Sequence, residues 1–299
     1  GEAGGLEAEP GGIGERDPPH IGPVPVLLGL DVFEDEVADQ ALVAPHRGAG
    51  RLYWRWQPPN TPMARVHPTA RIHPSAILEG DVSVGADTVI DPFVYIEGPV
   101  KIGARNHIHP SCVIGKGPEH RRASGGGQII VGDDNIVREL TVITRGTGER
   151  DTQIGSGCYL MDHVHISHDV LVEDGATLSH NVVLAGHVTV LQGATLGMSA
   201  VVHQHSVIGG YAMVGMGAVV TRDVPPFCLV RGNPARFARL NSHALPRAGI
   251  AAGDLSVRDG QLHSESPAVQ TLIDAALSRF VVLSRRPVMP LHLPARRPG

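Results

Sequence analysis

The sequence predicts an all-β protein that folds as a parallel β-helix, with a short helical region near the carboxyl end. Two observations predict this fold. An aliphatic residue recurs at every sixth position through most of the chain, and a small residue follows most of these aliphatic residues at a distance of four positions. The composition agrees, because only 4% of the 299 residues are aromatic while 37 are glycine. A core of this kind is built from many short, similar units.

The aliphatic repeat begins at Val66 and ends at Val220. All of its positions hold Ile, Leu or Val, and they are Val66, Ile72, Leu78, Val84, Ile90, Ile96, Ile102, Ile108, Ile114, Val131, Val137, Ile143, Ile154, Leu160, Ile166, Val172, Leu178, Leu184, Val190, Leu196, Val202, Ile208, Val214 and Val220. Small residues four positions later include Ala70, Ala76, Thr88, Cys112, Cys158, Ala176, Ala194, Ala200, Ser206, Ala212 and Ala218. One large and one small inward side chain make a short strand and a corner, and three such units close a triangular coil of about eighteen residues. The 24 units predict about eight coils, and the register predicts that Cys112 and Cys158 are reduced packing residues.

Two interruptions of the repeat predict loops that leave the coil. The first lies near residues 116–130 and carries Arg121 and Arg122, and the second lies near 144–153. Insertions into a solenoid more often lie on a binding face than elsewhere. These boundaries divide the chain into an amino-terminal extension (1–65), a β-helix domain (66–226) and a carboxyl-terminal region (227–299).

The two ends of the chain have different expected structures. Residues 1–22 are expected to be disordered, and 23–65 to form a strand or two. The coil is expected to end at "DVPP", residues 223–226, because proline cannot donate to a further ladder. Beyond it a helical region is expected, with Ser266 as a cap and Pro267 in the first turn. The expected apolar stripe of that helix is Val269, Leu272, Ile273, Ala276, Phe280 and Leu283.

Composition and charge exclude several classes of protein. The net charge of −5 argues against a nucleic-acid binder, and no apolar run is long enough to predict a membrane span. A secretory signal is absent from the printed sequence, so a cytoplasmic location is the default expectation. From Arg231 to Gly299 there are ten Arg and four Asp or Glu residues, a local balance of +6 that would suit an acidic partner.

Histidines are frequent between His163 and Val190, and none of the histidines of the coil occupies an inward position. Because residues eighteen apart stack about 4.8 Å from one another, His168 should lie beside Gly186, with Gln204 one coil further. A second column should contain Asp169, His187 and His205. A base near neutral pH, an acidic neighbour and a glycine N–H on one strip meet the needs of acyl transfer without a covalent intermediate.

The coil resembles the UDP-N-acetylglucosamine 3-O-acyltransferase family of lipid A biosynthesis. The likeness runs from "IHPSAILEGDVSVGADTVIDPFVYIEGPVKIG" through "VGDDNIVRELTVITRGT", "HISHD", "LAGH" and "AVVHQ" to "DVPP" and "RGN". It implies a left-handed β-helix and a homotrimer with shared active sites. It also implies that an acyl carrier protein is the acyl donor and a UDP-amino sugar the acceptor, with no cofactor and no metal.

The resemblance also assigns roles to individual residues. His168 is implied as the general base, Asp169 as its orienting acid and Gly186 as the oxyanion donor. The implied substrate-binding residues are His165, His187, His203, Gln204, Arg122, Asn241 and Arg247, with Arg122 in place of a lysine of the family. Met216 matches the position that sets acyl chain length, and its bulk predicts a medium-length acyl group.

Two other functions stay open at this point. A divergent relative could acylate another nucleotide sugar or a glycoside, with acyl coenzyme A as the donor. A zinc enzyme similar to the hexapeptide-repeat carbonic anhydrases could use the surface histidines as ligands.

Overall fold

The computed structural model describes residues 46–48, 51–53, 64–123, 126–251 and 253–292. The chain divides into two compact units, Gly1–Pro59 and Asn60–Gly299. In the first unit, β1 (His46–Gly48) pairs in antiparallel fashion with β2 (Arg51–Tyr53). The expectations for residues 1–45 lie outside the described residues.

The second unit contains a parallel coil whose strands form three sheets. Sheet 1 consists of β3 (Arg65–Val66), β6 (Val82–Val84), β9 (Val100–Ile102), β12 (Ile129–Val131), β15 (Thr152–Ile154), β18 (Leu171–Val172), β21 (Thr189–Val190) and β24 (Val207–Ile208). Sheet 2 consists of β4 (Arg71–Ile72), β7 (Val89–Ile90), β10 (His107–Ile108), β13 (Ile136–Val137), β16 (Tyr159–Leu160), β19 (Thr177–Leu178), β22 (Thr195–Leu196) and β25 (Met213–Val214), followed by two strands described below. Sheet 3 consists of β5 (Ile77–Glu79), β8 (Tyr95–Glu97), β11 (Val113–Lys116), β14 (Val142–Thr144), β17 (His165–Ile166), β20 (Val183–Leu184), β23 (Val201–Val202) and β26 (Val219–Val220).

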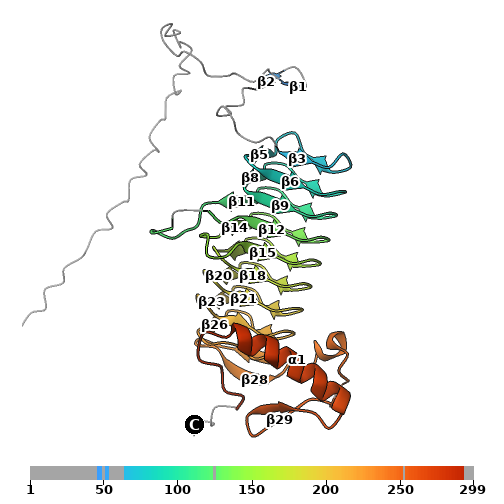
Figure 1. Cartoon of the computed structure of the whole chain (residues 1–299), viewed down its shortest axis with the longest axis vertical. Coiled ribbons are helices and arrows are strands. Elements are labelled where there is room, and N and C mark those ends of the chain that lie inside the picture. Colours follow the sequence, from blue (N-terminus) through green and yellow to red (C-terminus); the bar gives the residue numbers. More distant parts are fainter. Residues whose placement is uncertain (1–45, 49–50, 54–63, 124–125, 252, 293–299) are drawn as a thin grey trace, which may run out of the picture. The chain divides into compact units, whose positions relative to one another are not determined.

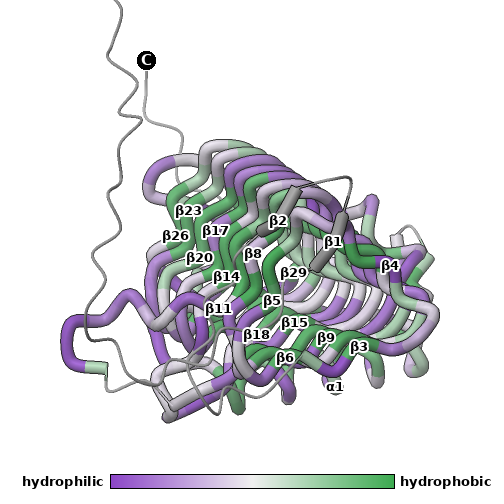
Figure 2. The backbone as a smooth tube through the Cα atoms, turned by 90° about the horizontal axis from the view of Figure 1, so that it is seen from above, coloured by the Kyte–Doolittle hydropathy of each residue, from purple (hydrophilic) through white to green (hydrophobic). Residues whose placement is uncertain are grey.

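Each coil contributes one strand to each sheet, so the coil has three corners. We call the turn from sheet 1 to sheet 2 the first corner, the turn from sheet 2 to sheet 3 the second corner, and the turn from sheet 3 to sheet 1 the third corner. Seen from above, strands of one sheet lie behind one another along each side (Figure 2). The eight coils predicted from the repeat are confirmed in the described part of the chain.

The core of the coil consists of the predicted aliphatic and small residues. Ile90, Leu178 and Val220 are among the aliphatic residues that are almost completely buried, and Cys112 and Cys158 are buried, free cysteines. Val66 is 39% exposed because it belongs to the first coil, whose strands pair on one side only among the described residues. Burial of apolar surface contributes about 25 cal/mol per Å², so the long stack of such layers stabilises the fold.

The coil does not end at residues 223–226, so this prediction is wrong. Val224 forms a parallel bridge with Ile208, and β27 (Cys228–Arg231) then pairs in parallel with β25. Pro225 and Pro226 lie at the turn between these two pairings, where no ladder N–H is needed. Part of a ninth coil therefore follows the two prolines.

The carboxyl-terminal region contains more strand than predicted. β28 (Arg236–Leu240) pairs with β27 in antiparallel fashion, and β29 (Ser256–Arg258) pairs with β30 (Gln261–His263). Among the described residues of this region, helix is limited to a 3₁₀ turn, η1 (Leu245–Ala248), and to α1 (Pro267–Leu283). The predicted short helical region is confirmed at α1, whereas strands β28, β29 and β30 were not predicted.

Helix α1 begins where the sequence predicts. The Ser266 side chain accepts a hydrogen bond from the Val269 N–H, which caps the helix. Val269, Ile273 and Phe280 are buried, whereas Leu272 is 45% exposed and was wrongly included in the stripe. Phe280 packs with Leu191 and Val207 of the coil, so the helix lies against its last turns, as Figure 1 shows. No helix among the described residues is long and apolar enough to cross a membrane.

Asp223 joins the coil to the segment after α1. Its carboxylate is completely buried and accepts a hydrogen bond from Val207 N at 2.8 Å. It also accepts hydrogen bonds from the Ser284 hydroxyl and from the N–H groups of Arg285 and Arg286, at 3.2 and 3.1 Å for the latter two. One carboxylate thus satisfies donors from both parts of the unit.

We expect Asp223→Ala to lower the free energy of unfolding by about 3 kcal/mol. The substitution leaves the N–H groups of Val207 and Arg285 without their acceptor, and each unsatisfied buried donor costs about 1–3 kcal/mol. Urea unfolding followed by circular dichroism measures the change. Asp254→Ala is the matched control, because Asp254 is exposed. Equal stability of the two variants would contradict the assigned role.

Candidate active site

Both predicted insertions leave the coil at the third corner. Residues 117–128 connect β11 with β12, and residues 145–151 connect β14 with β15. The first of these loops projects from the coil beside the labels of β11 and β14 (Figure 1). The next third corner along the coil, between β17 and β18, carries His168 and Asp169. The two loops are therefore placed over the histidines that the sequence singles out.

His168 and Asp169 form a buried pair. The distance from His168 Nδ1 to Asp169 Oδ2 is 2.8 Å. The His168 residue is 8% exposed and Asp169 is not exposed at all, so the outward-facing strip expected from the sequence is covered here rather than open. A carboxylate on Nδ1 fixes the ring tautomer that leaves Nε2 free to accept a proton.

The second loop is anchored on Asp169. Asp169 Oδ1 accepts hydrogen bonds from Thr147 N at 3.0 Å and Arg150 N at 3.3 Å, and the Arg150 guanidinium donates to the Asp169 carbonyl. Burial acts to raise the pKa of Asp169, but the hydrogen bonds from His168 and Thr147 outweigh it and lower this pKa. The carboxylate is therefore ionised at neutral pH, as an orienting group must be.

Gly186 lies one coil from His168 and leaves space for its ring. The stacking is shown by the hydrogen bond from His187 N to the His168 carbonyl at 3.0 Å. A Cβ atom on Gly186 would lie 2.5 Å from His168 Cε1 and 2.7 Å from Nε2, so a side chain cannot fit there without displacing the imidazole. The Gly186 N–H donates to no group among the described residues. It is therefore available to an oxyanion formed beside the imidazole.

His187 and His205 continue the predicted column from Asp169. His187 Nε2 lies 3.6 Å from Asp169 Oδ2, and the rings of His187 and His205 stack with centroids 4.5 Å apart. Burial lowers the pKa of His187, although the nearby Asp169 acts in the opposite direction. The uncharged imidazole is thus the favoured form in the folded protein at neutral pH.

This lowered pKa predicts how stability depends on pH. The unfolded chain takes up a proton at His187 near pH 6.5, while the folded protein does so only at lower pH. The free energy of unfolding should therefore fall as the pH drops below about 6.5, because the unfolded state binds more protons. Thermal unfolding between pH 7.5 and 5.5 should show a smaller fall for His187→Gln than for the wild type. Identical pH dependence in the two proteins would contradict this.

The first loop contributes two residues that the sequence analysis missed. Glu119 Oε2 lies 2.9 Å from His165 Nε2, and the ring of His120 meets that of His168 edge to face, with centroids 5.6 Å apart. Arg122 is exposed in the same loop. His203 and Gln204 are also exposed at the third corner, one coil beyond Gly186. For Glu119 and His120, the only signal in the sequence was their position in an insertion, because a loop has no repeat from which contacts can be derived.

Comparisons with known proteins agree with this geometry. The model for bacterial transferase hexapeptides matches residues 81–116 and 151–186, and the model for domain 2 of UDP-N-acetylglucosamine O-acyltransferase matches 223–257. An acyl-[acyl-carrier-protein]–UDP-N-acetylglucosamine O-acyltransferase of Saccharophagus degradans is 39% identical over 209 residues, which are 65% of this chain and 81% of that protein. This chain belongs to the UDP-N-acetylglucosamine O-acyltransferase family.

A second relative and a solved structure of the same family are also similar to this chain. The enzyme of the same name from Gloeothece citriformis is 41% identical over 50% of this chain and 55% of its own length. The chain thus spans about half the length of the first relatives that it matches. The crystal structure of the O-acyltransferase from Moraxella catarrhalis is 31% identical, with a TM-score of 0.62 over 76% of this chain and 98% of that one. The predicted left-handed parallel β-helix is confirmed by these similarities together with the sheet order.

Three predicted site residues of this O-acyltransferase family member lie away from His168 within one chain. The Asn241 amide donates to the Tyr211 carbonyl at 2.8 Å, and the Arg247 guanidinium donates to the Gly193 carbonyl at 3.1 Å. Both contacts are at the first corner. Met216 lies at the second corner, between β25 and β26, and is 70% exposed. The single chain therefore does not gather the whole predicted site at one place.

Proposed function

We propose that this protein transfers a 3-hydroxyacyl or related acyl group from an acyl carrier protein to the 3-hydroxyl of UDP-N-acetylglucosamine, the first step of lipid A biosynthesis. One observation carries the proposal. In a member of the O-acyltransferase family, the buried His168–Asp169 pair lies beside Gly186, whose N–H donates to no group among the described residues. A buried base beside a free donor supplies the two groups that direct acyl transfer needs.

The geometry supports a direct reaction between the two substrates. His168 Nε2 accepts the proton of the sugar 3-hydroxyl while the oxygen attacks the thioester carbonyl carbon. The Gly186 N–H donates to the oxyanion of the tetrahedral intermediate. When the intermediate collapses, the carbon–sulfur bond breaks and the imidazolium returns the proton to the leaving thiolate. Asp169 keeps Nδ1 protonated throughout, so Nε2 serves first as base and then as acid.

The third corner offers groups that suit a sugar nucleotide. We assign binding of the acceptor to His165, His187, His203, Gln204 and Arg122. Arg122 would contact the diphosphate, because its exposed guanidinium suits a phosphate better than a neutral hydroxyl. Glu119 contacts His165 Nε2 and so fixes the orientation of that imidazole.

The positions of Asn241, Arg247 and Met216 support a homotrimer with shared sites. These residues lie at the first and second corners, so they can reach a substrate on His168 only if they belong to another subunit. A closed trimer would bring different corners of neighbouring chains together. Sedimentation velocity tests this directly, and an active monomer would contradict the shared site.

The carboxyl-terminal region supports an acidic donor protein. Arg231, Arg236 and Arg239 are exposed on β27 and β28. Complementary charge increases the rate at which an acidic carrier protein associates. Acyl coenzyme A is the alternative donor, and a comparison of initial rates with both donors at several salt concentrations separates them. The predicted cytoplasmic location stays a prediction.

We expect Met216→Gly to shift the preference of the enzyme toward longer acyl donors. Met216 lies 48 residues from His168, about 13 Å further along the coil at 4.8 Å per coil, and its exposed side chain would block the end of an acyl groove. The expected change in discrimination between chain lengths is about 1–3 kcal/mol. Competition between donors of graded length measures it. Met198→Gly, one coil earlier at the same corner, is the matched control. An unchanged optimum in Met216→Gly would contradict the assignment.

Calorimetric titration with UDP-N-acetylglucosamine tests the acceptor. We expect saturable binding that is weakened by Arg122→Ala and His203→Ala. Equal affinity for a nucleotide sugar with another base or another amino sugar would favour the divergent relative over the proposed function.

A further inference from the structure

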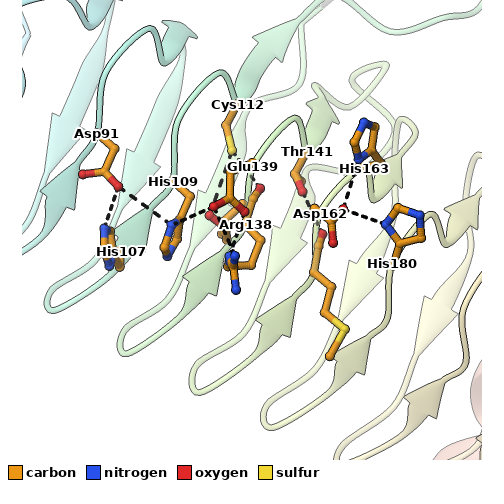
Figure 3. A network of polar contacts seen from close by, with 12 residues as sticks. Asp91, His107, His109, Cys112, Arg138, Glu139, Thr141, Asp162, His163 and His180 are labelled. Carbon is orange, nitrogen blue, oxygen red and sulfur yellow. Dashed lines mark hydrogen bonds and ion pairs between the residues drawn. The ribbon is translucent and has the colours of Figure 1, made fainter.

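A second group of histidines and carboxylates lies at the second corner, away from His168. Its members follow one another along successive coils, as Figure 3 shows. Asp91 and His109 each directly follow a strand of sheet 2 in neighbouring coils, eighteen residues apart, and His107 is the first residue of β10. Residues two apart on a strand point to the same side, so both imidazoles face outward beside Asp91.

The ligand atoms of Asp91, His107 and His109 converge. Asp91 Oδ2 lies 2.8 Å from His107 Nε2 and 3.8 Å from His109 Nδ1, and one ligand atom from each of the three lies within 4.8 Å of the others. The two imidazole rings stack with centroids 4.0 Å apart. Tetrahedral zinc with bonds of about 2.0–2.2 Å separates its ligand atoms by about 3.4 Å, a value within the observed range of separations.

Glu139 from the next coil supplies a second carboxylate as a fourth ligand. Its Oε1 lies 3.5 Å from His109 Nδ1, and Arg138 holds the carboxylate through contacts of 2.8 and 3.1 Å. The four residues therefore come from three successive coils. With neutral imidazoles and Arg138 included, the group carries a net charge of −1, which favours a divalent cation.

We propose that Asp91, His107 and His109, with Glu139 as the fourth ligand, form a binding site for zinc or a similar divalent transition-metal ion. Two imidazole nitrogens and two carboxylate oxygens are a donor set that suits zinc better than magnesium or calcium, which prefer oxygen ligands alone. Because this site is at the second corner and His168 at the third, the ion joins coils and takes no part in acyl transfer. The inference is independent of the proposed reaction.

The place of the site in the coil gives the ion a structural role. The coil of His107 and His109 is the last before the first insertion, residues 117–128, and Glu139 follows that insertion. A cation bound by residues that precede and follow this insertion would hold the neighbouring coils together where the insertion interrupts the repeat. Binding to the folded state alone raises stability by mass action.

Another group at the same corner is a matched control. Asp162 Oδ2 lies 3.2 Å from His163 Nδ1 and 2.7 Å from His180 Nδ1. The side chains of His163 and His180 are 50% and 45% exposed, compared with 41% and 20% for His107 and His109. The more solvated pair is expected to bind an ion more weakly, since water competes for its ligand atoms.

Zinc titration of the full chain tests the proposal. The protein is first treated with EDTA and desalted, and zinc chloride is then added while heat and bound zinc are measured. We expect one tight equivalent in the wild type, weakened at least 10-fold in the double variant His107→Gln and His109→Gln and retained in His163→Gln and His180→Gln. The unfolding midpoint of the wild type should rise with added zinc.

Three outcomes would overturn the assignment. They are absence of tight zinc binding in the wild type, full binding in the His107 and His109 variant, and loss of binding in the His163 and His180 variant alone. Asp91→Asn provides a milder substitution that keeps the shape of the side chain, and it should also weaken zinc binding. Circular dichroism of each variant confirms that the coil is folded before titration.

Discussion

Replacement of His168 by alanine should reduce kcat by at least about 10²–10⁴-fold. Loss of a general base typically has this effect, and no other described side chain pairs with Asp169 as closely as His168 does. His187, with its Nε2 atom 3.6 Å from Asp169 Oδ2, is a neighbouring imidazole that could take over part of the role. The initial rate of sugar nucleotide acylation, measured at saturating substrates, gives the loss.

The same variant should keep its fold and most of its affinity for the acceptor. His163→Ala is the matched control, because His163 is an exposed histidine at another corner and should leave kcat unchanged. Near-wild-type turnover in His168→Ala would exclude the proposed base. An equal loss in both variants would show that the effect is not specific to the third corner.

The second large effect is expected for Gly186→Ala. The new Cβ atom would meet the His168 ring at 2.5 Å, and the main chain that provides the oxyanion donor would have to move. Loss of one oxyanion donor costs about 10²–10³-fold in kcat, and displacement of the base adds to this loss. The decisive measurements are kcat and the binding of UDP-N-acetylglucosamine, of which only kcat should change strongly.

Gly210→Ala provides a close control for the glycine variant. Gly210 occupies the corresponding position at a first corner, two residues after a strand, and a Cβ atom there would have its nearest neighbour at 3.4 Å. This substitution should leave both kcat and stability close to the wild type. If Gly186→Ala retained most of the activity, neither the oxyanion role nor the steric requirement could stand.

Most of the coil could be predicted because each of its side chains obeys the same local rule. Leu184 and Val202 are inward for the same reason as Ile166, and the eighteen-residue period then places His168 beside Gly186 without further information. The alternation of sides on a strand also gave the outward direction of every coil histidine. The proposed pairing of a base with an oxyanion donor therefore follows from the repeat itself.

Features outside the repeat could not be predicted in this way. The contacts of Glu119 and His120 depend on how the first loop folds back, and the burial of His168 depends on both loops. Strand β28 depends on its antiparallel pairing with β27, a contact that the local pattern of its residues does not indicate. The corner of Met216 follows only from counting sheets as well as coils.

The most direct test of the central claim is mass spectrometry of the product formed from UDP-N-acetylglucosamine and a panel of acyl carrier protein and coenzyme A thioesters. We expect a single new species, the nucleotide sugar with one acyl group on its 3-hydroxyl, formed fastest from a medium-length acyl carrier protein. The same reaction with His168→Ala should form it far more slowly. Unmodified UDP-N-acetylglucosamine with every donor, from a folded trimeric protein, would contradict the proposed function.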